Sequence, residues 1–535
     1  MKRLCWLGWI IISVMLMGAD DPAAIRVPLI PTVAVYYVDK ANPQASDTNP
    51  GSEALPWKTI GHAAAAAQAG DTIYVKAGTY LERVHPASSG SPGKRITFQA
   101  LPRRSVTMWG FFTQGSDFLT INGFNITTDP SLTGWTDLYG VFIYSNDVEV
   151  VDNYLYDLKS SAITGYWHDP YPQRAHVANN TIYHSQMGIV VTGYAWLVEG
   201  NEVARLYNYG NGDSDYMRFF GNDHVIRWNT FHGSLISEIG SAHVDCFQTF
   251  DNNGEFGTNI TIDGNRCSEF HQGFMGEALY YHNISRIIFK NNLFVHGWAW
   301  GLCVVDIPYV TAINNTFADI AYYGIGLSKN AHDGLALNNI FYNVETSILI
   351  QDTASIVEDS NLFFLSQPPT APGGHDKVGI DPRFVDLAGD DYHLKSGSPA
   401  IDAGAPSTLT GQDLDRVSRP QLNGWDIGAY EYLPPLKLAG LAGNQTVELS
   451  WQVNVELPGG ITWQIDYLPA NGVPPSPVTG LSSSTREFSL SGLTNYTRYT
   501  ITLTAMDGAS ALYSVTLQLM PSNHTLILPV IFRGF

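Results

Sequence analysis

The chain contains little cysteine, little charge and few long apolar runs. Its 535 residues include four cysteines, and charged residues make up 15%. Apart from Leu4 to Gly18, no apolar run approaches the length needed to cross a membrane. The chain has 29 Lys and Arg against 49 Asp and Glu, and the net charge of −20 argues against nucleic acid or an anionic membrane surface as a partner. An acidic polysaccharide would need a bridging cation or a local basic patch.

The cysteines favour neither a metal site nor a disulfide framework. Cys5 lies in the N-terminal apolar run, which leaves Cys246, Cys267 and Cys303, an odd number without metal-ligand spacing. We therefore expect buried free thiols. The alternative is a bridge between Cys246 and Cys267, which requires the two to meet on neighbouring coils.

The N-terminus has the pattern of an export signal. Met1-Lys-Arg precedes the apolar run, and a cleavage point near Ala19 or Ala24 predicts a signal peptide at residues 1–24. A transmembrane anchor is the alternative, but about 15 apolar residues are short for a spanning helix. We expect a secreted or cell-surface protein, monomeric and with no membrane span after processing.

A short pattern recurs through the middle of the chain: an Asn followed two residues later by an apolar side chain. Its intervals of 21 to 36 residues predict a solenoid of about ten coils, each burying its apolar side against the next. The asparagines can satisfy buried backbone groups in one internal column, so we assign them a structural role. They are Asn122, Asn153, Asn180, Asn201, Asn229, Asn265, Asn292, Asn315, Asn339 and Asn361.

Two coils depart from this pattern and predict the functional site. After most of the asparagines a strand opens with a small residue, such as Gly188 or Gly273, but after Asn201 and Asn229 the strand comes later. Both coils therefore carry an insertion on the same side. In our alignment Asp215 and Asp245 take the small-residue position and become lateral neighbours.

The same alignment gathers further polar residues on one face of two or three coils. Asp213, His243 and His271 lie two residues before the small-residue position, and Glu277 lies four residues after it. Arg218 falls at an inward position in this register. A slip of one residue would turn a strand's side chains to the opposite face.

Aromatic residues at turns and outward positions suit the apolar faces of sugars. About half of them are expected to pack loops instead. They are Trp135, Tyr166, Trp167, Tyr171, Tyr194, Trp196, Tyr207, Tyr209, Trp298 and Trp300. The predicted substrate-binding residues are Arg218, Gln248, Glu277, Tyr207, Tyr209, Trp196 and Trp298.

The N-terminal segment resembles a known family. Trp57 to Gln68 is a helix by propensity, and the GDTIYVKAGTY stretch from Gly70 to Tyr80 follows it. Such a helix covers the open end of a solenoid. The segment resembles the N-terminal cap of the pectin-lyase-like superfamily, which implies a right-handed parallel β-helix, predicted over residues 35–375. Lyases, glycosidases, epimerases and adhesins share this scaffold.

Residues 376–432 include Val378-Gly-Ile-Asp-Pro-Arg-Phe and the stretch from Trp425 to Tyr432. Through these two stretches the segment resembles the choice-of-anchor Q region of secreted bacterial β-helix proteins. The resemblance implies export, surface association and structural roles for Asp381, Asp402 and Asp413. Residues 436–521 alternate with period two and resemble a fibronectin type III sandwich. A tail, 522–535, follows. The predicted fold class is therefore mainly β, a parallel β-helix followed by a C-terminal β-sandwich.

Three chemistries fit the acidic patch. The metal ligands Asp213, Asp215 and Asp245 could hold Ca²⁺. Resemblance to pectate-lyase-like enzymes then implies β-elimination from a uronate, although no Lys or Arg other than Arg218 lies near the patch. Alternatively, Asp215 and Asp245 could hydrolyse a glycosidic bond at about 5 Å separation, or Asp213 and Asp245 at about 6.5 to 9.5 Å.

The third reading is a non-catalytic carbohydrate-binding or adhesion protein. The two matched insertions argue against it, because a plain solvated face needs neither. We predict a polysaccharide-cleaving enzyme, with a slight preference for a Ca²⁺-assisted uronate lyase over a glycoside hydrolase. The predicted catalytic residues are Asp215, His243, Asp245 and His271.

Overall fold

A computed structural model describes residues 34–129, 131, 138–210 and 212–523. The predicted signal peptide, Trp135 and most of the predicted C-terminal tail lie outside these residues. Within the described part, no helix is long and apolar enough to cross a membrane.

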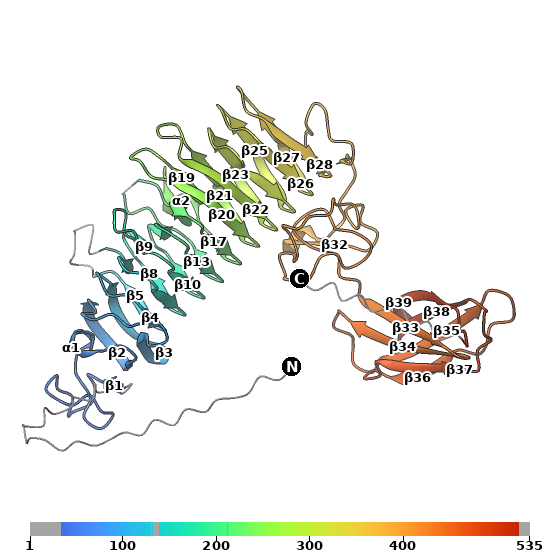
Figure 1. Cartoon of the computed structure of the whole chain (residues 1–535), viewed down its shortest axis with the longest axis horizontal. Helices are drawn as coiled ribbons and strands as arrows, with labels where there is room; N and C mark the ends of the chain where they lie inside the picture. Colours follow the sequence, from blue (N-terminus) through green and yellow to red (C-terminus); the bar gives the residue numbers. More distant parts are fainter. Residues whose placement is uncertain (1–33, 130, 132–137, 211, 524–535) are drawn as a thin grey trace, which may run out of the picture.

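The body is a right-handed parallel β-helix (Figure 1), which confirms the solenoid predicted from the repeat and the fold implied by the resemblance of the N-terminal cap. Each strand pairs in parallel with the strand of the coil before and the coil after, and together they form one 30-stranded sheet that turns around three sides of the coil. The apolar side chains on the inner face of these strands form one continuous core. Because each coil buries this stripe only against its neighbours, the repeat length sets the coil length.

The first side is formed by β4 (Leu119–Asn122), β7 (Glu149–Val151), β10 (His176–Ala178), β13 (Leu197–Glu199), β17 (Val225–Arg227), β20 (Gly257–Asp263), β22 (Ile284–Lys290), β24 (Thr311–Ile313), β26 (Gly334–Leu337) and β28 (Ile356–Asp359). The two-residue strand β16 (Gly221–Asn222) pairs with the start of β20.

The second side contains β5 (Asn125–Thr127), β8 (Tyr154–Tyr156), β11 (Thr181–Tyr183), β14 (Glu202–Ala204), β18 (Thr230–His232), β29 (Leu362–Phe364) and β30 (Lys377–Val378). The third side contains β6 (Val141–Ile143), β9 (Ser161–Gly165), β12 (Met187–Val191), β15 (Met217–Phe219) and β19 (Asp245–Phe250). Four long strands run through both of these sides: β21 (Arg266–Glu277), β23 (Leu293–Val305), β25 (Thr316–Ser328) and β27 (Ile340–Ile350).

Nine of the ten predicted asparagines form one internal ladder. From Asn153 to Asn361, each of the first eight donates its Nδ2 to the Oδ1 of the next, at 2.9 to 3.0 Å. Asn122 is the exception, and its assignment was wrong: the Phe124 backbone N–H, not that of Asn122, donates to Asn153 Oδ1. Phe124 therefore occupies the ladder position in that coil.

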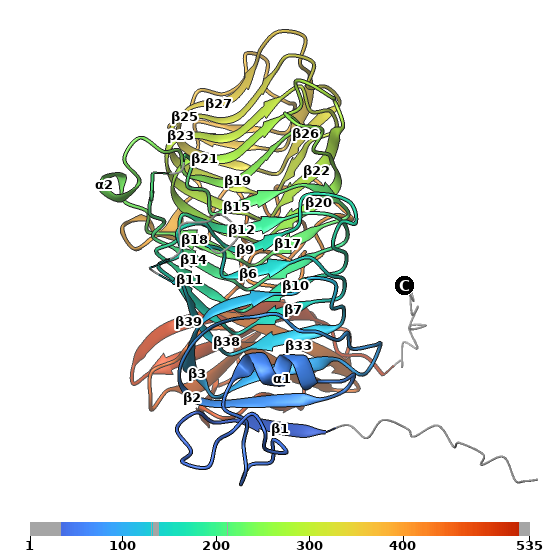
Figure 2. The same cartoon turned by 90° about the vertical axis from the view of Figure 1, so that its left-hand side faces the viewer.

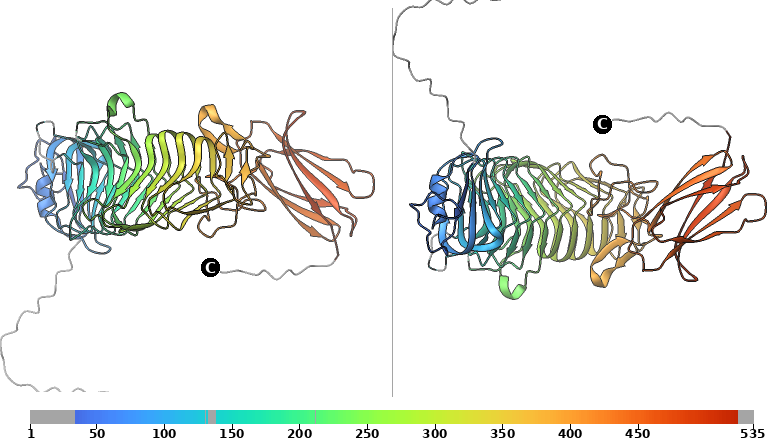
Figure 3. Two further views of the ribbon diagram at one scale, coloured as in Figure 1. Left: turned by 90° about the horizontal axis from the view of Figure 1, so that it is seen from above. Right: turned by 90° about the horizontal axis from the view of Figure 1, so that it is seen from below.

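A short cap covers the N-terminal end of the solenoid, at the opposite end from the C-terminal sandwich (Figure 3). It comprises β1 (Val35–Val38), the long strands β2 (Thr72–Val84) and β3 (Ile96–Phe112), and α1 (Ile60–Ala66). The helix is shorter than the predicted Trp57 to Gln68. Thr59 caps it by accepting the His62 N–H, and Trp57 forms a bridge with β1 instead.

Residues 376–432 pack on the outer face of the second side. They contain β31 (Phe384–Asp386), η2 (Leu387–Gly389) and β32 (Asp391–Leu394). Phe384, Tyr392 and Ile427 share a second core with outward residues of β23 to β29, among them Leu293 and Ile340.

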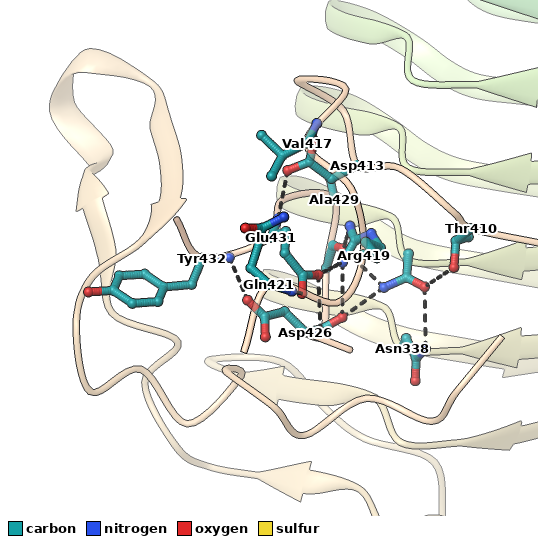
Figure 4. Close-up of polar contacts among 12 residues, drawn as sticks. Asn338, Thr410, Asp413, Val417, Arg419, Gln421, Asp426, Ala429, Glu431 and Tyr432 are labelled. Atoms are coloured by element: carbon teal, nitrogen blue, oxygen red, sulfur yellow. Dashed lines mark hydrogen bonds and ion pairs between the residues drawn. The ribbon is translucent and has the colours of Figure 1, made fainter. Parts of the chain in front are cut away.

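A buried polar network holds this region together (Figure 4). The Arg419 guanidinium pairs with Glu431 at 2.7 Å, and both side chains are almost fully buried. Asp413 accepts the backbone N–H groups of Val417 and Glu431. Because these partners satisfy the buried charges, removing any one of them would leave another unpaired.

The C-terminal part is a β-sandwich with its own core around Trp451 and Trp463. One antiparallel sheet contains β33 (Leu436–Gly443), β34 (Thr446–Val453) and β37 (Glu487–Ser491). The other contains β35 (Thr462–Pro469), β36 (Val478–Ser482), β38 (Tyr499–Asp507) and β39 (Ser510–Leu519). Its likeness to fibronectin type III remains a prediction from the sequence.

Candidate functional site

The two predicted insertions flank the third side of the solenoid. The second of them forms α2 (Ile236–Ile239), which projects from the body (Figure 2). The first packs against it: Arg205 pairs with Glu238 at 2.6 Å, and the Asn208 N–H donates to the Glu238 carbonyl. The insertions therefore support each other beside the strand ends that carry the acidic residues.

Asp215 and Asp245 are lateral neighbours at the start of β15 and β19. The Asp245 backbone N–H donates to Asp215 Oδ1 at 3.1 Å, and the Tyr216 N–H donates to the Asp245 carbonyl. Both side chains are buried, with 1% and 0% of the residue exposed. In this conformation neither carboxyl group has surface that a substrate could touch.

The alignment that led to this pair was shifted by one residue relative to the flanking coils. Asp245 pairs with Gln272 in β21, not with Gly273, and Gly188 lies opposite Tyr216, not opposite Asp215. The statement that the aspartates replace a small residue is therefore wrong. The slip arises because the interval between the asparagine ladder and the strand differs among coils.

Arg218 was predicted to point inward, and this was also wrong. Tyr216 and Met217 are both fully buried, so two consecutive side chains face the core at this corner. Strict alternation breaks there, and Arg218 emerges on the outer face, level with Gln248. Its side chain is 15% exposed.

The outward guanidinium of Arg218 is held by two aspartates. Its Nε donates to Asp215 Oδ2 at 2.6 Å, and its Nη2 lies 3.2 Å from Asp213 Oδ2. Gln248 donates its Nε2 to Asp245 Oδ2 at 3.2 Å, whereas its buried Oε1 has no partner within the described residues. A buried acceptor without a donor costs free energy, so this oxygen adds to the destabilisation of the cluster.

Burial raises the pKa of both acidic residues. For Asp215 the Arg218 guanidinium opposes this rise and the Asp213 carboxylate adds to it. For Asp245 the pKa is raised well above its ordinary value, first by burial and then by the neighbouring Asp215 and Asp213 carboxylates. Asp245 therefore retains its proton to higher pH than an exposed aspartate does.

The two predicted histidines are adjacent on the same side. Their rings lie 5.4 Å apart, and the His271 ring meets Trp298 edge-on at 4.9 Å. The Val244 N–H donates to His271 Nδ1 at 3.1 Å, so the neutral ring carries its proton on Nε2. Burial, and then the charge of His243, lower the pKa of His271. His271 is thus a hydrogen-bond donor to the surface.

His243 differs from His271 in exposure. It is solvent-exposed, and its imidazole makes no hydrogen bond within the part of the chain that the structure describes. Its carbonyl accepts the Ser214 N–H at 3.0 Å, which places it in the coil beside Asp213. The imidazole of His243 is therefore accessible to a bound molecule.

The predicted calcium ligands do not fit a calcium ion as they are arranged. Asp213 and Asp215 hold the Arg218 guanidinium, and Asp245 lies against the side-chain amides of Gln248 and Gln272. Among the described residues no group of three His, Cys, Asp or Glu side chains is placed to hold a metal ion.

The predicted aromatic and acidic contributors are dispersed. Trp196 is 1% exposed and belongs to the core, so its assignment to substrate binding was wrong. Tyr207 and Tyr209 pack around His184, and Gln186 bridges the Tyr209 N–H to the Asp213 carbonyl.

Glu277 is half-buried and pairs laterally with Phe250. Burial and then Asp251 raise its pKa. The sequence alignment placed Glu277 opposite Thr249, one residue away from its actual partner. Arg218 pairs with Gln248, so Glu277 lies two residues further along the strands than Arg218. Phe250, which the sequence analysis did not single out, lies under the Arg218 guanidinium with its ring centre 5.7 Å away.

Cys246 and Cys267 form a disulfide with their Cα atoms 6.3 Å apart. The expectation of free thiols was wrong for this pair and holds for Cys303, which is buried and free. Cys246 in β19 and Cys267 in β21 both point into the solenoid from different sides of the coil. The bridge therefore links β19 to β21 at the residue that follows Asp245.

The fold defines the class of protein: a right-handed parallel β-helix. The solved complex of XylC with xylose matches 75% of this chain and 98% of its own, with a TM-score of 0.50 and 14% identity. A mannuronic acid specific polysaccharide family 6 lyase from human gut microbiota has a TM-score of 0.37 and 12% identity. The match covers 65% of this chain and 82% of the lyase. The tailspike protein of E. coli bacteriophage HK620 in complex with pentasaccharide has a TM-score of 0.38 and 13% identity. The match covers 84% of this chain and 86% of the tailspike chain. These likenesses concern the fold.

Sequence comparison adds two shorter matches. A family described as a protein of unknown function, DUF1565, matches residues 44–86, which span much of the N-terminal cap. The uncharacterized protein YwoF of Bacillus subtilis (strain 168) is 27% identical over 141 residues, or 24% of this chain. The match covers 30% of YwoF, so this chain spans less than a third of that protein's length.

Proposed function

We propose that this protein is secreted or attached to the cell surface, binds a polysaccharide across the third side of its β-helix, and cleaves it next to a uronate residue by β-elimination. The complex of XylC with xylose supports a sugar ligand on this fold. The choice among reactions depends on the site itself.

The observation that carries the proposal is the outward position of Arg218. The side chain emerges on an otherwise acidic face, and Asp213 and Asp215 fix its orientation. Because the aspartates hold Nε and Nη2, the remaining nitrogen, Nη1, can donate charge-assisted hydrogen bonds to a uronate carboxylate. It thereby neutralises the charge that would otherwise oppose removal of the proton α to that carboxylate.

The exposed imidazole of His243 is the candidate base. In the elimination the base takes the proton from the carbon next to the carboxylate, and that electron pair forms a carbon–carbon double bond. The bond to the glycosidic oxygen breaks, and this oxygen takes a proton from water. The Nε2–H of His271 lies on the same face, where it can donate a hydrogen bond to the chain.

The burial of Asp215 and Asp245 weighs against hydrolysis by this pair. A general acid must lie within hydrogen-bond reach of the glycosidic oxygen, and neither carboxyl group reaches the surface. In our proposal Asp215 positions Arg218, and neither Asp215 nor Asp245 touches the substrate.

The test uses the purified protein with paired panels of uronate-containing and neutral glycans, with and without chelator. Ultraviolet absorbance of the unsaturated uronate reports elimination, reducing ends report any cleavage, and affinity electrophoresis reports binding. We expect unsaturated products, and a loss of at least about 100-fold in kcat/KM for His243→Ala. The matched control is His282→Ala, which removes another exposed histidine.

Arg218→Lys keeps the charge but loses the planar guanidinium, so KM for uronate polymers should rise. The melting temperature should fall as well, because the buried Asp215 carboxylate loses part of its pairing. Reducing ends without unsaturation would indicate a hydrolase instead. Retention without cleavage would indicate the non-catalytic binding protein. Full activity of His243→Ala would place the base elsewhere.

A further inference from the structure

A small aromatic pocket lies where β15 ends, beginning two residues after Arg218. Its walls are the rings of Trp167, Tyr171, Phe220 and Phe256, with Thr192 and Glu255 at its edge, and it leaves a cavity of about 20 Å³. A cavity of at least about 10 to 15 Å³ holds one water-sized group. The pocket therefore has room for one small group and no more.

The pocket walls are fixed by contacts with one another. Trp167 and Phe220 lie with ring centres 5.0 Å apart, and Tyr171 meets Phe256 edge-on at 5.4 Å. The loop that carries Glu255 is held as well, because Asn253 donates both its N–H and its Nδ2 to that carboxylate. The cavity is thus a preformed feature of the surface.

The pocket also depends on two glycines with positive φ. Gly193 and Gly221 have φ of 79° and 105°. A Cβ at Gly221 would collide with the Gly193 carbonyl, and one at Gly193 would collide with the Pro172 carbonyl. No residue other than glycine therefore fits at these two positions. Because neither glycine has a side chain, the space between the rings stays open.

A continuous line of side chains links the pocket to Arg218. The guanidinium lies over the Phe250 ring, and Phe250 meets Phe220 with ring centres 4.9 Å apart. Phe220 is only two residues from Arg218 in the same coil. When a uronate binds Arg218 through its carboxylate, substituents of that sugar or of the next sugar in the polysaccharide therefore lie beside the pocket.

We infer that the pocket receives a methyl group carried by the polysaccharide. A methyl group matches the size of the cavity, and aromatic walls favour an apolar group over a water molecule that would find few partners there. The Glu255 carboxylate at the edge can accept a hydrogen bond from a hydroxyl beside that methyl. The inference rests on the proposed function, because it takes the polysaccharide to be bound at Arg218.

Two sources of such a methyl group can be distinguished by experiment: an O-acetyl ester and the C6 methyl of a 6-deoxyhexose. One arm measures binding of O-acetylated alginate against the same polymer after deacetylation. The other measures rhamnogalacturonan, which contains a 6-deoxyhexose, against polygalacturonate, with free rhamnose and mannose as competitors. We expect about tenfold tighter binding of the methyl-bearing member in one arm, the usual scale for one such group in an apolar pocket.

Trp167→Leu and Phe256→Leu each remove one wall and should reduce this preference to near unity, while binding of the unsubstituted polymer stays unchanged. Tyr322→Leu, which removes a 54% exposed ring on β25, is the matched control and should keep the preference. Melting temperatures identify any variant that fails to fold, and either variant suffices for the test.

Equal wild-type binding of both members in both arms would overturn the inference and leave the proposed function standing. A preference that survives in every folded wall variant would overturn it too. Absence of binding to all four polymers would contradict the proposed function and the inference with it.

Discussion

At the scale of single residues, the site is organised by an arginine that alternation along the strand would bury. Two successive core residues, Tyr216 and Met217, turn the chain at the start of β15 and bring Arg218 to the surface. Asp215, buried behind it, then serves as its counterion at 2.6 Å. Burying a carboxylate is costly unless it is paired and hydrogen-bonded. The cluster is therefore retained at a cost in stability, as is common at functional sites.

The raised pKa of Asp245 predicts a pH dependence of folding. Because the folded state binds this proton more tightly than the unfolded state does, the contribution to stability is present below about pH 4 and is lost as pH rises through the folded pKa. Asp245→Asn removes this titration. Its free energy of unfolding should equal or exceed that of the wild type at pH 8, and the advantage should disappear toward pH 4.

Urea unfolding of both proteins across this range measures the difference, and Asp507→Asn, at an exposed position, is the control. A difference between Asp245→Asn and wild type that does not change with pH would show that Asp245 is ionised in the folded protein.

At the scale of elements, the asparagine ladder sets the register of the coils. The Oδ1 of each inner asparagine accepts hydrogen bonds from the backbone N–H and the Nδ2 of the asparagine before it. Its own Nδ2 donates hydrogen bonds to a strand carbonyl and to the next asparagine. For Asn265 these partners are Asn229, Ile226 and Asn292, all within 3.1 Å. The ladder satisfies polar groups that would otherwise be buried without partners.

Replacing one member should therefore be expensive. Asn265→Ala leaves an N–H, a carbonyl and an amide unsatisfied in the interior, and should lower the free energy of unfolding by about 3 kcal/mol or more. Asn252→Ala, at an exposed position in the loop after β19, should change it by less than about 0.5 kcal/mol. Denaturant unfolding compares the two. Equal effects would mean that water replaces the lost partners.

At the scale of the whole molecule, the two C-terminal parts differ in how they depend on the solenoid. Residues 376–432 cover outward apolar residues of β23 to β29 and share a core with them. The sandwich that begins at Leu436 has a core of its own. The first is thus part of the β-helix in energetic terms, whereas the second is a separate module.

Two truncations test this division. A chain ending at Tyr432 should keep the melting temperature of the β-helix and its binding of soluble glycan. A chain ending at Gly379 exposes Leu293, Ile340 and their neighbours, so it should melt earlier and aggregate. Calorimetry of both chains decides the question. Loss of cooperative unfolding in the longer chain would show that the sandwich belongs to the core.

The sequence by itself determined the solenoid, its asparagine column and the neighbouring positions of Asp215 and Asp245. These follow from periodicity, because each coil must repeat the same inward residues in order to stack. The capping helix and the alternating strands of the C-terminal sandwich could likewise be predicted, since they depend on local propensity and on period two.

Only the tertiary structure decided which way the site residues point. The corner at Tyr216 and Met217, the burial of Trp196 and the bridge between Cys246 and Cys267 depend on where the chain bends between sides of the coil. Local alternation carries no information about such a bend, because one extra inward residue reverses every side chain that follows. For the same reason the outward Arg218 and the aromatic pocket beside it could be found only once the coils were stacked.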